Sequence, residues 1–137
     1  MDPRDIYITD YDLKRLKELL QVGIGFGERD RPSLETLQDE LDRAHIVKPA
    51  AVPHDVVTMN SRVRLTDVET NEQQVYTVVF PSEANLEHCK ISILAPIGTA
   101  ILGYSVGDTV KWQVPGGVKT LRIEELLYQP EAEGHRL

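Results

Sequence analysis

The period at which hydrophobic residues recur changes once along this chain, and that change limits the folds it can adopt. Near the start, Leu13, Leu16 and Leu20 recur at the spacing of one face of an α-helix. From Arg62 onward, apolar residues such as Val63 alternate with polar ones, which is the spacing of a half-buried β-strand. The sequence therefore predicts an α+β protein in which a helical first third is followed by strands.

Two helices are expected in the first third. Thr9 followed by Asp12 has the form of a capping box that begins a helix, and Gly23 ends the leucine pattern. A second helix is predicted to start at Ser33 and to continue as far as Lys48, ahead of a proline. Each helix has roughly 14 residues, so at about 1.5 Å per residue the antiparallel pair extends only about 20 Å. A pair this short buries little apolar surface alone and has to pack on the rest of the chain or on a partner.

The alternating part of the sequence predicts five strands and one short helix. Its DVETNEQ segment has the composition of a hairpin turn between the first two strands. Strands with one short helix on a single face form an α+β domain built on a twisted antiparallel sheet. The predicted order is a strand from residue 62, strands at 75–79 and 90–94, a helix at 96–102, and strands at 109–114 and 118–128.

The segment APIGTAILGYSVGDTV, residues 95–110, has two glycines at the spacing found in a phosphate-binding loop. A loop of that type needs a lysine and then a serine or threonine after its second glycine, because the lysine reaches the β and γ phosphates. Here Gly103 is followed by Tyr104, so the nucleotide site is not expected. We interpret the segment as a short buried helix with Gly98 and Gly103 at its flanks.

No catalytic, cofactor or metal site is expected from the remaining motifs. His54 and Asp55 are adjacent in an extended segment, so their side chains point in opposite directions and do not form a base–carboxylate pair. His88 and Cys89 lack a second pair of ligands at zinc spacing. We therefore expect a protein that is not an enzyme and that carries neither a cofactor nor a metal.

Charge favours a protein partner over a nucleic acid or a membrane. The net charge is −7, and acidic and basic residues occur in both halves of the chain. Direct nucleic-acid binding requires clustered lysine and arginine, so it is not expected. No stretch approaches the roughly 18 apolar residues of a membrane span, and no signal peptide is recognised. We expect a cytoplasmic monomer, and the single cysteine fits a reducing compartment.

Three segments between residues 57 and 128 resemble the C-terminal domain of the bacterial Gre transcript-cleavage factors, which bind RNA polymerase. They are VTMNSRVRLTDVETNEQQVYTVV, ISILAPIGTAILGYSVGDTV and PGGVKTLRIEELLY, and they occur in the family's order. Three further segments are similar to a shortened subgroup of that family, whose members are named for regulation of nucleoside diphosphate kinase. They are ELDRAHIVKPAAVPHDVVTMNSRV, GDTVKW and YQPEAEG.

The resemblance implies a fold and a function. It implies a short antiparallel coiled-coil hairpin at residues 1–50 and, at residues 51–137, an FKBP-like antiparallel β-sheet domain with one short helix. It also implies a transcription elongation regulator that binds RNA polymerase and competes with Gre factors at the secondary channel. Gre factors hold a catalytic magnesium at the acidic tip of a longer finger. Glu28 and Asp30 lie at the tip of the hairpin here but do not align with that acidic tip, so no transcript-cleavage activity is expected.

The resemblance also points to a docking surface. In Gre factors an acidic residue, a serine and a proline precede the short helix and contact polymerase, and the matching positions here are Leu94, Ala95 and Pro96. Pro96 is therefore the implied contact, with Leu94 and Ile97 as apolar neighbours. From the residues alone, Leu94 and Ile97 fit a core role equally well, because leucine and isoleucine are among the residues most often fully buried.

Two alternative functions remain open at this point. The name of the subgroup suggests regulation of the level of nucleoside diphosphate kinase and of nucleotide pools, most simply by an indirect route. The FKBP-like fold suggests a prolyl isomerase. An isomerase pocket is lined with aromatic side chains, and the chain has only one tryptophan, two phenylalanines and five tyrosines to supply them.

Overall fold

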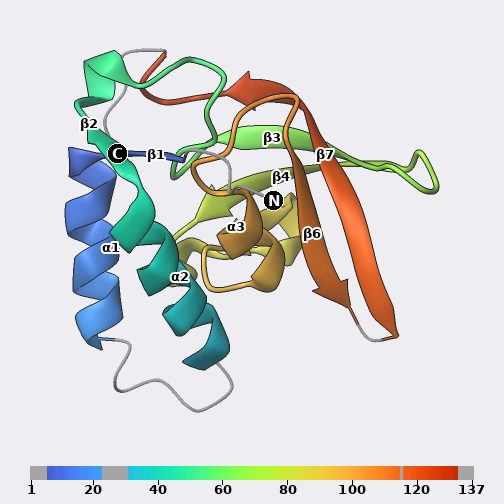
Figure 1. Cartoon of the computed structure of the whole chain (residues 1–137), viewed down its shortest axis with the longest axis horizontal. Helices are drawn as coiled ribbons and strands as arrows, with labels where there is room; N and C mark the ends of the chain where they lie inside the picture. The colour runs from blue at the N-terminus through green and yellow to red at the C-terminus, as the bar shows by residue number, and fades with distance from the viewer. Residues whose placement is uncertain (1–5, 23–30, 115, 133–137) are drawn as a thin grey trace.

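The helical first third of the chain forms two short helices that stand beside a β-sheet (Figure 1). The computed structural model describes residues 6–22, 31–114 and 116–132. Helix α1 (Asp10–Val22) and helix α2 (Arg31–Arg43) have 13 residues each. The start of α1 is as predicted, since the Oγ1 atom of Thr9 accepts the backbone N–H of Asp12 at 3.1 Å. No helix in these ranges is both long and apolar enough to cross a membrane.

Two short strands close the base of the helix pair. Strand β1 (Tyr7–Thr9) pairs in parallel with strand β2 (His45–Val47), and the N–H of His45 donates to the carbonyl of Ile6 at 2.9 Å. The prediction that the second helix continues to Lys48 is therefore wrong. The reason is local, because β-branched residues such as Ile46 favour an extended backbone where a partner strand lies alongside.

Five strands form the main sheet in the order β5-β4-β3-β7-β6. The sequential order of strands and helix is as predicted, but β5 runs parallel to β4, so the prediction of a purely antiparallel sheet is wrong. Only a tight hairpin requires the antiparallel direction. The connection between β4 and β5 instead contains two 3-10 helices, at Pro81–Glu83 and Leu86–His88. The strands are β3 (Arg62–Asp67), β4 (Gln73–Val79), β5 (Lys90–Ser92), β6 (Thr109–Val114) and β7 (Gly117–Tyr128).

One hydrophobic core joins the helices to the sheet. Leu16 of α1 and Leu37 of α2 have no exposed surface. They belong to the same cluster of packed side chains as Val63 of β3 and Ile123 of β7. The short helix pair therefore packs on the rest of the chain, which gives its leucines the burial that they cannot obtain from each other.

Helix α3 (Pro96–Ile101) lies between α2 and β6 (Figure 1). Gly98 stands inside this helix rather than at its flank, which corrects the sequence-based interpretation. A Cβ atom at Gly98 would lie only 2.6 Å from the carbonyl oxygen of Ser92, so glycine allows α3 to approach the end of β5. Gly103 ends the helical segment as predicted, with a φ of +84° that side chains rarely permit.

Replacing Gly98 with alanine is expected to lower the free energy of unfolding by about 1–3 kcal/mol, because the added methyl group overpacks the contact with Ser92. Urea denaturation monitored by circular dichroism measures the change. The control is Glu35→Ala on the exposed side of α2, which should stay within about 0.5 kcal/mol of the unsubstituted chain. Equal stability of the two variants would show that α3 has room to move away from β5.

Candidate functional site

The three contact residues that the sequence predicts lie at the start of α3 and in the turn before it. Leu94 and Ile97 are 9% and 6% exposed and belong to the hydrophobic core, so each presents only an edge at the surface. Pro96 is the first residue of α3, and its side chain lies outside the described part of the structure. Ile97 is accessible where it lines a pocket in the surface.

Hydrogen bonds hold the turn that leads into α3 in one conformation. The Oγ atom of Ser92 accepts the N–H of Leu94 at 3.0 Å, and the carbonyl of Ser92 accepts the N–H of Ala95 at 2.9 Å. The N–H of Thr99 then donates to the carbonyl of Ala95 at 3.0 Å. Because both sides of the turn are anchored, the start of α3 is a preformed surface.

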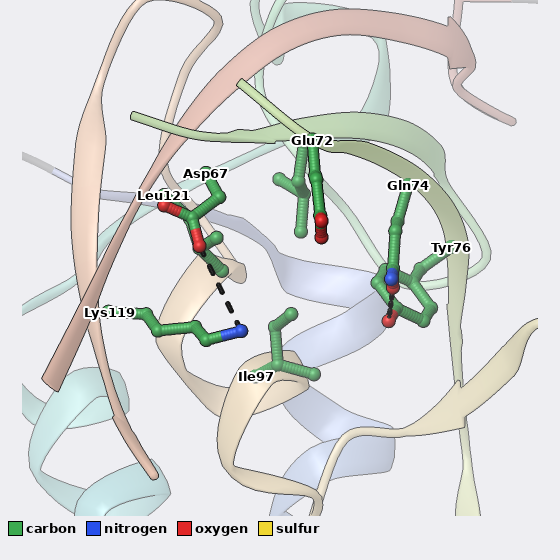
Figure 2. Close-up of a pocket in the computed structure, with 8 residues that line it drawn as sticks. Asp67, Glu72, Gln74, Tyr76, Ile97, Lys119 and Leu121 are labelled. Carbon is green, nitrogen blue, oxygen red and sulfur yellow. Dashed lines mark hydrogen bonds and ion pairs between the residues drawn. The ribbon is translucent and has the colours of Figure 1, made fainter. Parts of the chain in front are cut away.

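A pocket of about 170 Å³ lies directly beside Ile97 (Figure 2). Strands β3, β4 and β7, the residue before β4, and α3 all contribute side chains to it. Its apolar wall consists of Leu65, Ile97 and Leu121, each less than 10% exposed. The full lining is Leu65, Asp67, Glu72, Gln74, Tyr76, Ile97, Lys119 and Leu121.

The polar side of the pocket is built around the β3–β4 turn. Asp67 fixes this turn, because its Oδ1 atom accepts the N–H of Glu69 at 3.0 Å. Its other carboxylate oxygen lies 3.8 Å from the Nζ atom of Lys119 on β7. The hydroxyl of Tyr76 donates to the Oε1 atom of Gln74. Burial raises the pKa of the Tyr76 phenol, so this hydroxyl stays protonated in neutral solution.

Of the other residues singled out in the sequence, none that the structure describes lines this pocket. Glu28 and Asp30 lie outside the described residues. In the part of the chain that the structure describes, no three histidine, cysteine, aspartate or glutamate side chains gather in a way that could hold a metal ion. Cys89 is exposed at the end of a 3-10 helix.

A second polar cluster, not recognised in the sequence, joins α1 to the sheet domain. The carboxylate of Asp12 is 3% exposed and accepts the N–H of Met59 at 3.2 Å. Next to it, the Oγ1 atom of Thr58 donates to Glu131 at 2.7 Å. Burial, and then the charge of Glu131, raise the pKa of Asp12 from its ordinary value of 3.8 to about 7. In the sequence, Asp12 was recognised only as part of the helix cap, and a place in a cap does not indicate that a side chain is buried.

Comparison with known proteins gives matches along almost the whole chain. Residues 52–128 match the family model described as transcription elongation factor GreA/GreB, C-terminal part, and residues 4–47 match the model described as Rnk N-terminus. The regulator of nucleoside diphosphate kinase from Escherichia coli (strain K12) is 44% identical over 133 residues, which is 96% of each chain. The transcription elongation factor GreA of Syntrophotalea carbinolica is 35% identical over 95 residues, 69% of this chain and 60% of that protein.

The structural comparison extends over helices and sheet together. A solved GreA/GreB elongation factor from Nitrosomonas europaea superposes with a TM-score of 0.76 at 40% sequence identity. The superposition covers 92% of this chain and all of the other. The predicted α+β class is therefore confirmed.

Proposed function

The chain belongs to the GreA/GreB family of transcription elongation factors, as a member with an Rnk-type N-terminus, and from this premise we propose that it binds bacterial RNA polymerase. In this proposal it is an elongation regulator that competes with Gre factors for their site at the secondary channel and does not stimulate transcript cleavage. The observation that carries the proposal is the match to a GreA/GreB factor over 92% of the chain, together with the GreA/GreB family model over residues 52–128, which include the start of α3.

The absence of cleavage activity in this proposal follows from the length and packing of the helices. At about 1.5 Å per residue, α1 and α2 are each about 20 Å long. Leu16 and Leu37 are committed to the core that the helices share with the sheet, so only part of each helix is free to project. As a short coiled-coil finger on an FKBP-like docking domain, the pair occupies the entrance of the channel without carrying acidic residues to the active centre.

The proposed contact with polymerase is formed by Leu94, Pro96 and Ile97. The centres of protein interfaces are poor in charge, and an apolar edge beside a pocket suits such a centre. Leu94 and Ile97 are also held by the core, so little conformational freedom is lost when a partner binds them.

Replacing Ile97 with alanine is expected to weaken binding to core RNA polymerase about tenfold, because a contact at the centre of an interface is lost. Fluorescence titration measures the affinity, and a Gre factor added as competitor should displace the unsubstituted chain. The matched control is Ile101→Ala in the same helix. Ile101 has no exposed surface and does not line the pocket, so its loss should cost similar stability and leave affinity within about twofold. Failure of the chain to bind polymerase, or binding that a Gre factor does not disturb, would overturn the proposed function.

The two alternatives have less support. The E. coli relative is named for regulation of nucleoside diphosphate kinase, and an effect on transcription accounts for a change in the level of that kinase without direct contact. An unchanged kinase level in a deletion strain would remove this alternative. For a prolyl isomerase, the pocket beside α3 offers Tyr76 as its one aromatic lining residue, so it lacks the aromatic walls of such a site.

A further inference from the structure

We propose that the pocket beside α3 receives a basic side chain, an arginine or a lysine, from the surface of RNA polymerase. This inference rests on the proposed function, and it specifies the chemistry that the partner presents at that surface. Its basis is the combination of an apolar wall with a polar rim that carries more carboxylates than ammonium groups.

The apolar wall suits the stem of a long basic side chain. Leu65, Ile97 and Leu121 converge on the pocket from β3, α3 and β7, and each is almost fully buried in the unbound chain. Arginine and lysine commonly lay their methylene groups along apolar surface while their charged ends stay at a polar rim. An acidic side chain has a shorter stem and would leave most of this wall uncovered.

The charged rim suits the end of such a side chain. Two carboxylates, Asp67 and Glu72, face one ammonium group, Lys119, so the charges that line the pocket sum to −1. Asp67 lies 3.8 Å from Lys119, whereas among the described residues no hydrogen bond or ion pair engages the carboxylate of Glu72. Figure 2 shows this carboxylate directed into the pocket above Ile97. Glu72 is thus the carboxylate of the rim that is available to an incoming cation.

Gln74 adds a neutral acceptor on the same side. Its Oε1 atom already accepts the hydroxyl of Tyr76, which fixes the amide at the edge of the pocket (Figure 2). A carbonyl oxygen has two lone pairs, so this atom can accept a second hydrogen bond from a guanidinium or ammonium group. Glu72 and Gln74 together thus provide two acceptors for one basic group, which favours the forked geometry of arginine.

Charge substitutions with opposite expected effects test the inference. Glu72→Lys should weaken binding to core RNA polymerase by about fivefold to tenfold, because it reverses the charge that attracts the incoming cation. Lys119→Gln should strengthen binding by about twofold, because it removes a like charge from the rim. Affinities are measured by fluorescence titration at low and at high salt, and both differences should shrink at high salt.

The matched control is Glu69→Lys. Glu69 is an exposed residue of the same β3–β4 turn, and it does not line the pocket, so this variant changes the net charge equally without touching the rim. Its affinity should stay within about twofold of the unsubstituted chain. Equal loss in Glu72→Lys and Glu69→Lys, or weaker binding of Lys119→Gln, would overturn the inference while polymerase binding stands. If the unsubstituted chain fails to bind polymerase, the proposed function itself fails and this inference with it.

Discussion

Replacing Leu37 with alanine is expected to lower the free energy of unfolding by about 2–5 kcal/mol, because it removes a fully buried side chain and leaves a cavity. Leu37 belongs to α2 but packs in the cluster that includes Val63 and Ile123 of the sheet. The loss should therefore destabilise helices and sheet together. Urea denaturation followed by circular dichroism at helix wavelengths, together with hydrogen exchange of β3 amides, measures both parts in one experiment.

The control for this variant is Leu86→Ala. Leu86 is 81% exposed, so its truncation should change stability by no more than about 0.5 kcal/mol. A single transition that moves as a whole in Leu37→Ala would mean that residues 1–50 and 51–137 fold as one cooperative unit. Loss of the helical signal alone would contradict this expectation and favour two independently stable domains.

Raising the pH through neutrality is expected to destabilise the chain, and Asp12 is the main cause. Its pKa is 3.8 ordinarily and about 7 in the folded chain, so the folded state holds its proton more tightly than the unfolded state. The resulting stabilisation is complete below about pH 4 and is lost as the pH rises through 7. One pKa unit corresponds to about 1.4 kcal/mol, so the shift amounts to roughly 4 kcal/mol.

The Asp12→Asn variant isolates this contribution. Asparagine keeps an oxygen that can accept the N–H of Met59 but does not titrate, so its stability should change much less between pH 5 and pH 8. Glu131 and Arg15, whose charges act on Asp12, are unchanged in the variant. Asp39→Asn on the exposed side of α2 serves as the control and should follow the unsubstituted chain. Parallel pH profiles for the two asparagine variants would contradict the assignment to Asp12.

Local sequence signals predicted most helices and strands of the fold. They did not predict how segments far apart in the sequence pair with each other. The change of hydrophobic period correctly separated α1 and α2 from the five-stranded sheet, and the Thr9 cap placed the start of α1. The errors in the strands lie at β2, which pairs with β1, and at β5. Whether residues 45–47 become helix or strand depends on β1 lying beside them, and the direction of β5 depends on the path of its connection.

The candidate site was predictable only in part, for the same reason. The resemblance placed contacts at Leu94, Pro96 and Ile97, because those residues are contiguous. The rim of the pocket is assembled from the β3–β4 turn and from β7, which the sheet brings together by pairing Asp67 with Leu121. Nothing in the composition of the turn indicates that its acids face Lys119. Nothing near Asp12 in the sequence indicates that it is buried and accepts the N–H of Met59 from another segment.

The parallel pairing of β1 with β2 ties the start of α1 to the end of α2. Both helices are joined to the same two-stranded ribbon, so neither helix can tilt at this end without the other. The ribbon is in turn bonded to the end of the α3 segment, since the N–H of Tyr7 donates to the carbonyl of Gly103 at 3.1 Å. A force on the helix pair would therefore be passed through backbone hydrogen bonds to the segment that ends α3.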